Sequence, residues 1–219
     1  TIVFSDTKLN LKKKKQKNSR KWFDMTPQPA IQNIIAFYTQ ILDAKCTDIQ
    51  ITDADKDNLS QRLLPYFQQP IGESTSTGIW SVFYDHLTDN DTDIPNGKKD
   101  DIMYLVDTHI DVIRFSQQVI IRLKQFLSEK QVQTEIPESS YDKLLDLTIR
   151  RSEHLQNGDE SQETVIREII DDFEDMLESH NVDIPNEDKI QSENPAIIYG
   201  TDYGELTSAI EELVETLPI

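Results

Sequence analysis

The chain has few of the residues on which enzymes most often depend. Its 219 residues include one cysteine, six glycines and four histidines. One cysteine excludes an internal disulfide and is typical of a reducing compartment. No glycine-rich segment forms a phosphate-binding loop of the Walker or dinucleotide type, and there is no Gly-x-Ser-x-Gly nucleophile elbow. We therefore expect a protein that is not an enzyme and that needs no cofactor.

Long apolar runs are lacking as well. No stretch approaches the roughly 20 apolar residues that span a bilayer, and no signal-peptide pattern opens the chain. Apolar residues make up 37% of the sequence, but they fall in periodic blocks, which is typical of a folded core. We expect a soluble intracellular protein that makes no membrane contact and lies in the cytoplasm, or in the nucleus if its source is eukaryotic.

Positive charge is scarce outside one end of the chain. The formal net charge is −18, yet the first 21 residues hold eight lysines and arginines against one aspartate, which is +7. Subtracting this from −18 leaves −25 on the other 198 residues. An acidic body of that size repels polyanions and attracts basic surfaces. The sequence predicts a basic N-terminal arm over 1–21 and a single acidic domain over 22–219.

Apolar residues at helical spacing predict an all-α fold of about seven helices, with at most a minor pair of short strands. The strongest pattern consists of three rows in which a residue recurs every seven positions. The rows are Leu105, Val112, Val119 and Phe126; Val106, Ile113, Ile120 and Leu127; and Ile102, His109, Ser116 and Leu123. So broad a face predicts a long central helix over about 100–131, covered on much of its circumference.

Several residues mark the expected ends of helices. Thr52 is a typical N-cap for the helix that follows it, and Pro65 and Pro70 are expected to close that helix. Asn157-Gly158 is a typical C-terminal stop, because glycine accepts the left-handed conformation in which many helices end.

The stretch DHLTDNDTDIPNGKKDD, residues 85–101, has the alternating carboxylates of a calcium loop. An EF-hand needs oxygen ligands at positions 1, 3, 5 and 12 and glycine at position 6. The sixth position is Ile94, for which a positive φ is costly. We therefore favour a solvated acidic loop over a metal site. The ligands of the weaker alternative are Asp89, Asp91, Asp93 and Asp100.

The four histidines show no metal-ligand spacing, since no His-x-x-x-His or Glu-x-x-His pair is present. His109 lies on the apolar face of the central helix, so we interpret it as a core histidine that hydrogen-bonds to Ser116 or to a tyrosine. His86 and His180 are placed near the ends of helices, where an imidazole interacts favourably with the helix dipole.

The basic arm contains KKKKQKNSRKWF and permits three interpretations. It can contact the phosphates of nucleic acid, act as a nuclear-import signal, or remain a solvated tail that lies on the protein's own acidic body. The residues of the nucleic-acid alternative are Lys12, Lys13, Lys14, Lys15, Lys17, Arg20 and Lys21.

A second candidate surface is the acidic outer face of the helix expected between residues 159 and 180. Such a face raises the rate of association with basic proteins. The residues expected to contact a partner are Asp171, Asp172, Asp175 and Glu178, followed by Tyr199, Asp202 and Tyr203 nearer the C-terminus. The last three belong to NPAIIYGTDYGELTSAIEEL, which resembles the tyrosine-bearing turn and following helix of bacteriocin-nuclease immunity proteins but lacks their double-tyrosine turn.

The sequence thus favours a non-enzymatic interaction module whose acidic surface binds a basic protein, as an inhibitor, an immunity-type protein or a complex subunit. The first alternative is a nucleic-acid-associated component that binds through residues 12–21. The second is a metal-dependent enzyme or calcium-binding protein that uses the 89–101 loop. No oligomeric state is predicted.

Overall fold

Helices form most of the chain that the structure describes. The computed structural model describes residues 27–45, 49–89, 96–182, 203–215 and 217. These ranges contain seven helices and no strand, so the all-α prediction is confirmed. The helices are α2 (Gln28–Lys45), α3 (Asp53–Phe67), α4 (Glu73–Asp89), α5 (Asn96–Glu129), α6 (Glu138–Gln156), α7 (Gln162–Ser179) and α8 (Gly204–Val214).

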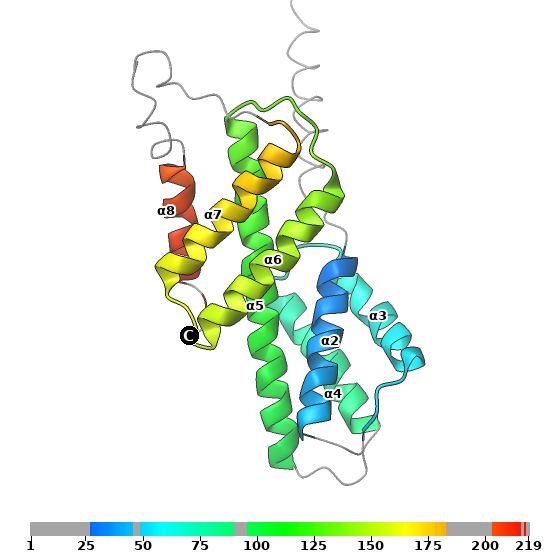
Figure 1. Cartoon of the computed structure of the whole chain (residues 1–219). Helices are drawn as coiled ribbons and strands as arrows, with labels where there is room; N and C mark the ends of the chain where they lie inside the picture. Colours follow the sequence, from blue (N-terminus) through cyan, green and yellow to red (C-terminus); the bar gives the residue numbers. More distant parts are fainter. Residues whose placement is uncertain (1–26, 46–48, 90–95, 183–202, 216, 218–219) are drawn as a thin grey trace, which may run out of the picture.

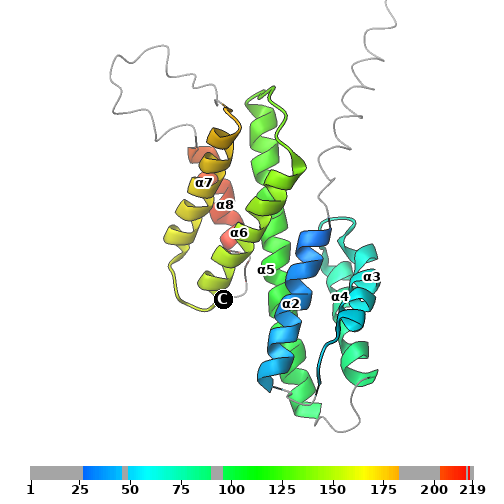
Figure 2. The ribbon, with the colours of Figure 1, turned by 45° about the vertical axis from the view of Figure 1, so that its right-hand side comes forward.

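The helices form two four-membered groups that share α5 (Figures 1 and 2). In the first group α2 packs on α3, α3 on α4, and α4 and α2 on α5. In the second group α6 packs on α5 and α7, and α8 packs on α7 and α5. Figure 1 shows the first group beside the N-terminal half of α5 and the second beside its C-terminal half. A direct contact between α2 and α6 joins the two groups. The single-domain prediction for 22–219 stays a prediction.

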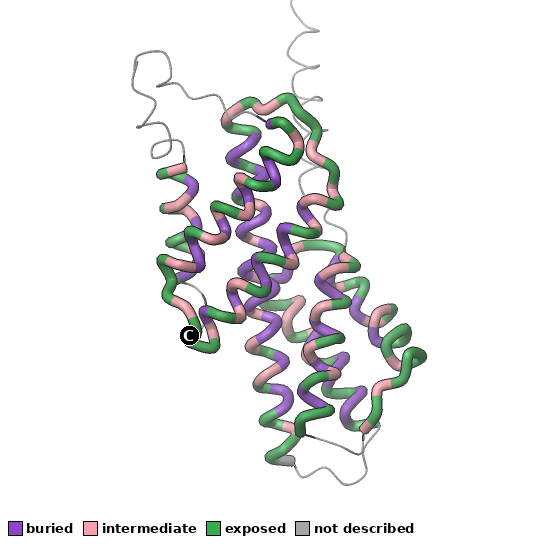
Figure 3. Tube along the Cα trace, viewed as in Figure 1, coloured by how far each residue is buried: buried purple, intermediate pink, exposed green. Residues whose placement is uncertain are grey.

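Helix α5 is buried over most of its length, as its three rows of seven-residue repeats predict (Figure 3). Every member of those rows is buried except Leu105, which is half-buried. Two helix groups approach α5 from different sides, so one apolar stripe would not be wide enough to cover both contacts. Each fully buried aliphatic side chain contributes about 1.5–3 kcal/mol to folding.

The caps expected at Thr52 and Gly158 are both present. The Thr52 hydroxyl accepts from the Asp55 amide at 3.2 Å, and the Asp55 carboxylate accepts from the Thr52 amide at 2.9 Å, which completes a capping box. Gly158 has φ of +74° after α6, and its amide donates to the Leu155 carbonyl at 3.0 Å. Asn181 takes φ of +53° after α7 in the same kind of turn.

Two predicted boundaries differ from the structure. Helix α3 continues through Pro65 and ends at Phe67, so the expectation that Pro65 closes it is wrong. Proline removes one amide hydrogen bond near the end of the helix, while the buried Leu63 and Phe67 on either side hold that turn against the core. The central helix begins at Asn96, four residues earlier than expected, and it ends at Glu129, two residues earlier than expected.

The turn after α6 depends on a backbone conformation that glycine adopts at no steric cost. Replacing Gly158 by alanine should lower the free energy of unfolding by about 1 kcal/mol, because an L-residue is strained at positive φ. Gly97→Ala is the matched control, since no neighbour lies within 4 Å of its added Cβ and its φ is not positive. Urea denaturation of both variants measures the difference. Equal stability of the two variants would contradict the assigned role of Gly158.

Candidate interaction surface on helices α7 and α8

Helix α7 separates apolar and acidic side chains onto opposite faces. The Ser161 hydroxyl accepts from the Thr164 amide at 3.2 Å and caps its first turn. Its inward face is apolar, and it carries the buried residues Val165, Ile166, Ile169, Phe173, Met176 and Leu177. The remaining positions carry most of the acidic residues that the sequence singles out, so the helix presents them away from the core.

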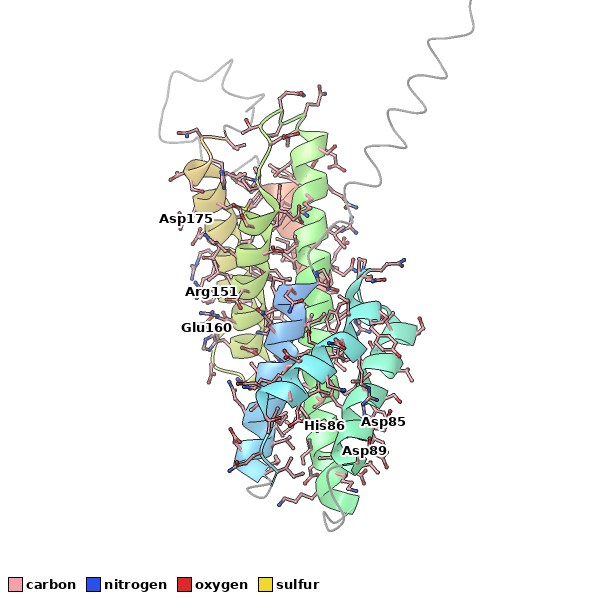
Figure 4. All side chains as sticks on the ribbon, turned by 90° about the vertical axis from the view of Figure 1, so that its right-hand side faces the viewer. Asp85, His86, Asp89, Arg151, Glu160 and Asp175 are labelled. Atoms are coloured by element: carbon pink, nitrogen blue, oxygen red, sulfur yellow. The ribbon has the colours of Figure 1, made fainter. Side chains whose placement is uncertain are left out.

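The structure divides the four acidic residues predicted on this helix. Asp171, Asp175 and Glu178 are exposed. The side chain of Asp172 is only 16% exposed, and its carboxylate lies 3.4 Å from Nε of Arg151 on α6. Arg151 also pairs with Glu168 at 2.9 Å, so it joins α6 to α7 (Figure 4). Asp172 therefore takes part in the contact between these helices, and the other three residues face solvent.

Of the second predicted set, the structure describes Tyr203 alone. Its ring centroid lies 5.8 Å from that of Phe126 on α5 and 6.5 Å from that of Phe173 on α7. Tyr203 thus anchors the start of α8 against the other two helices. Tyr199 and Asp202 lie outside the described residues, as do the basic-arm residues Lys12, Lys13, Lys14, Lys15, Lys17, Arg20 and Lys21.

A groove of about 580 Å³ runs between α7 and α8, and we call it the acidic groove. Three of its lining side chains, those of Ile166, Ile170 and Tyr203, are largely apolar. Four of its lining residues are acidic and one is basic. The acids are Glu163, Asp171 and Glu174 of α7 and Glu211 of α8, and the base is Arg167. The groove therefore combines an apolar surface with a formal charge of −3.

The carboxylates on this side of α7 are close enough to disfavour one another's charge. Burial raises the pKa of Glu174, and the nearby Asp171, Glu178 and Asp175 raise it further. Burial also raises the pKa of Asp172, although the Arg151 guanidinium opposes that shift. A positive group placed in the groove would stabilise the ionised carboxylates, so the surface is suited electrostatically to a cationic ligand.

The acidic character of α7 is evident in the sequence, whereas the groove is not. Glu163, Arg167 and Asp171 follow one another at intervals of four, which places them along one side of the helix. In the sequence, this spacing is the feature that points to one side of the groove. Their partner across the groove, Glu211, is 40 residues beyond Asp171, and only the packing of α8 on α7 brings it near.

His109 is the core histidine that its position on α5 predicts. It is 1% exposed, its ring stacks on Phe37 with centroids 3.9 Å apart, and Nε2 lies 2.6 Å from Oδ1 of Asn33. Nδ1 lies 3.4 Å from a carboxylate oxygen of Glu153 on α6. The expected bond to Ser116 is wrong, because that hydroxyl donates to the carbonyl of Val112 at 2.9 Å.

The two histidines expected at helix ends also make specific contacts. His86 lies in the last turn of α4, where Nδ1 is 3.2 Å from the Tyr38 hydroxyl, and burial lowers its pKa. His180 caps α7, and its Nε2 is 2.8 Å from the Ser140 hydroxyl of α6. Both imidazoles therefore connect a helix end to a neighbouring helix.

The weaker calcium alternative stays a prediction. Asp89 ends α4 and Asp100 is the fifth residue of α5, both exposed, whereas Asp91 and Asp93 lie outside the described residues. Within the described ranges, no three His, Cys, Asp or Glu side chains lie together in a way that could hold a metal ion. Figure 4 shows Asp85, His86 and Asp89 on α4, away from Arg151 and Asp175.

Comparison with other proteins adds no family to this geometry. No family model, curated protein or solved structure matches the chain. Among the described helices, none combines the length and the apolarity that crossing a bilayer requires. The function has to be argued from the charges, contacts and grooves of the described residues.

The stability of the fold should depend on pH through His109, and the sign of this dependence follows from the burial of its ring. Burial lowers its pKa from 6.5 to about 3 in the folded chain. The unfolded chain binds a proton at this residue near pH 6.5, so acidification below that value favours unfolding. Between pH 7 and pH 5 this group lowers the free energy of unfolding by about 2 kcal/mol. His109→Gln should therefore lose less stability than the parent chain over this range in urea denaturation.

The exposed His154 provides the control for this measurement. His154→Gln removes an imidazole from the surface beside Asp159 and leaves His109 in place, so the loss of stability that His109 generates between pH 7 and pH 5 should persist. If His109→Gln and His154→Gln lose equal stability between pH 7 and pH 5, folding does not keep His109 uncharged.

Proposed function

We propose that this protein is a non-enzymatic interaction module whose acidic groove, between α7 and α8, binds a basic amphipathic segment of a protein partner. One observation supports this proposal above the others. An apolar lining, contributed by Ile166, Ile170 and Tyr203, lies beside four carboxylates that only one arginine accompanies. On this proposal the protein acts as an inhibitor, an immunity-type protein or a subunit of a complex.

The apolar lining sets the shape of the ligand. A purely polar cationic chain would leave Ile170 and Tyr203 half-exposed, as they are in the unbound surface. A segment with an apolar face would cover them, and burial contributes about 25 cal/mol per Å² of apolar area. An amphipathic helix laid into a groove is a recurrent way of achieving such burial. We therefore favour a basic helix over a simple run of lysines.

The acidic rim sets the charge of the ligand. Lysine or arginine side chains flanking the apolar face would meet Glu163 and Asp171 of α7 and Glu211 of α8. Their positive charge would also relieve the crowding that raises the pKa of Glu174. The −25 carried by residues 22–219 would speed the approach of such a partner, by about 10- to 1,000-fold at low ionic strength.

Other acidic positions offer less to a cation. Asp53 pairs with Lys56 at 3.3 Å, and Asp55 is part of the capping box of α3. On α6, Asp146 pairs with Arg150 at 2.6 Å. These carboxylates already have partners within their own helices. The acidic groove differs from these positions, because its carboxylates come from two helices and lie beside apolar side chains.

Charge reversal on both sides of the groove tests the proposal. The probe is a helical peptide of about four turns with leucine on one face and lysine on the other. Asp171→Lys combined with Glu211→Lys should weaken its binding about 10- to 100-fold, since each lost or reversed contact costs roughly 1 kcal/mol or more. Calorimetric titration at low ionic strength measures the dissociation constants.

Two controls accompany this titration. Asp43→Lys combined with Asp57→Lys changes the net charge equally at exposed positions on α2 and α3, and it should leave affinity within about twofold. A peptide with glutamate in place of lysine should not bind. If both double variants weaken binding equally, the attraction is a property of net charge, and the groove is not the site.

A further inference from the structure

The chain itself contains a segment with the chemistry that the acidic groove is expected to bind. Residues 8–23 read KLNLKKKKQKNSRKWF and include eight lysines and arginines and no acidic residue. Apolar side chains lie near both ends of this segment, at Leu9 and Leu11 and at Trp22 and Phe23. The segment therefore offers positive charge together with apolar anchors at Leu9 and Leu11, the end farther from α2, and these are the two features that the groove would recognise.

We propose that the basic arm, residues 8–23, binds the acidic groove of its own chain and is displaced when a basic partner binds. This inference rests on the proposed function, because it assigns an internal competitor to the same site. It makes the chain self-inhibited: the arm shields the groove from weak cationic ligands and admits a partner that binds more tightly.

The extended arm is about as long as α5, which runs along both helix groups (Figure 1). Lys12 lies 15 positions before Pro27, where the described chain begins ahead of α2. Fully extended, that length of chain spans about 50 Å. Helix α5 has 34 residues and is the longest element, and at 1.5 Å per residue it measures about 51 Å. The reach of the arm is thus comparable with the long dimension of the fold.

The other large groove is less suited to the arm. It measures about 720 Å³ and lies at the connection from α5 to α6, where Glu135 and Glu138 are among its lining residues. There the buried Lys124 already pairs with Glu138 at 2.5 Å and lies 4.4 Å from the centre of the Tyr141 ring. This groove supplies its own cation, whereas the acidic groove has four carboxylates and a single arginine. Charge complementarity therefore favours the acidic groove.

Tethering makes even a weak contact effective. Covalent attachment through a linker of this length gives an effective concentration on the order of 1 mM, so an arm with an intrinsic dissociation constant of about 0.1 mM would occupy the groove most of the time. An external ligand must compete with it, and its apparent dissociation constant rises by about tenfold. Salt should weaken the arm's contact, because the attraction is between partly exposed charges.

Carbodiimide cross-linking of the full chain tests where the arm lies. The reagent joins a lysine to a carboxylate only when the two are in contact. At low ionic strength we expect links within one chain from Lys12–Lys21 to Glu163, Asp171, Glu174 or Glu211, mapped by mass spectrometry. The Asp171→Lys and Glu211→Lys double variant should lose most of them. Links mainly to carboxylates elsewhere, links between two chains, or no links would each overturn the inference.

Competition supplies an independent readout on the full chain. Replacing Lys12, Lys13, Lys14 and Lys15 by glutamine should tighten binding of the leucine–lysine peptide about tenfold. The matched control removes the same charge elsewhere, by the substitutions Lys45→Gln, Lys98→Gln, Lys99→Gln and Lys143→Gln. Equal affinity of the two variants would overturn self-inhibition while leaving the proposed function standing. Failure of the peptide to bind either variant would instead contradict the proposed function.

Discussion

Helix α5 must present an apolar surface to two groups of helices at once, and the rest of the structure depends on that constraint. Between residues 109 and 120 nine of twelve side chains are buried, which is far more than a single stripe of a surface helix would provide. The polar members of this stretch are satisfied internally. Ser116 donates to Val112, and the Gln117 side-chain oxygen accepts from the Ile71 amide at 2.9 Å. Buried polar groups are tolerated here because each has a partner.

The same constraint accounts for the position of the acidic groove. Because α6 and α8 both pack on α5, α7 lies between them on the outer side of the second group, and its residues Asp171, Asp175 and Glu178 are exposed among the residues that the structure describes. Arg151 fixes one edge of α7 to α6, and Tyr203 fixes the start of α8 against Phe173. The carboxylates of the groove are therefore held near one another by packing that is independent of their mutual repulsion. A cationic ligand could therefore bind them without a rearrangement of the helices.

The fold was largely predictable because its signals are local or strictly periodic. The seven-residue rows of α5, the cap at Thr52 and the stop at Gly158 are each encoded within a few residues, and the structure confirms them. Pro65 was misleading, since the core contacts of Leu63 and Phe67 sustain a turn that proline alone would end. The groove was not predictable, because its two sides meet only through the pairing of α7 with α8. Nor could spacing predict that Asp172 would pair with Arg151, which is 21 residues away.

A basic ligand should stabilise the ionised form of the groove carboxylates, and the ionisation of Glu174 reports on this. NMR titration of its side-chain carboxyl, in the chain with Lys12–Lys15 replaced by glutamine, would follow its ionisation with and without the leucine–lysine peptide. We expect the pKa of Glu174 to lie above the ordinary 4.5 in the unliganded chain, because burial and its acidic neighbours raise it. That pKa should fall when the peptide binds. A pKa that the bound peptide leaves unchanged would mean that the positive charges of the peptide do not lie in the acidic groove.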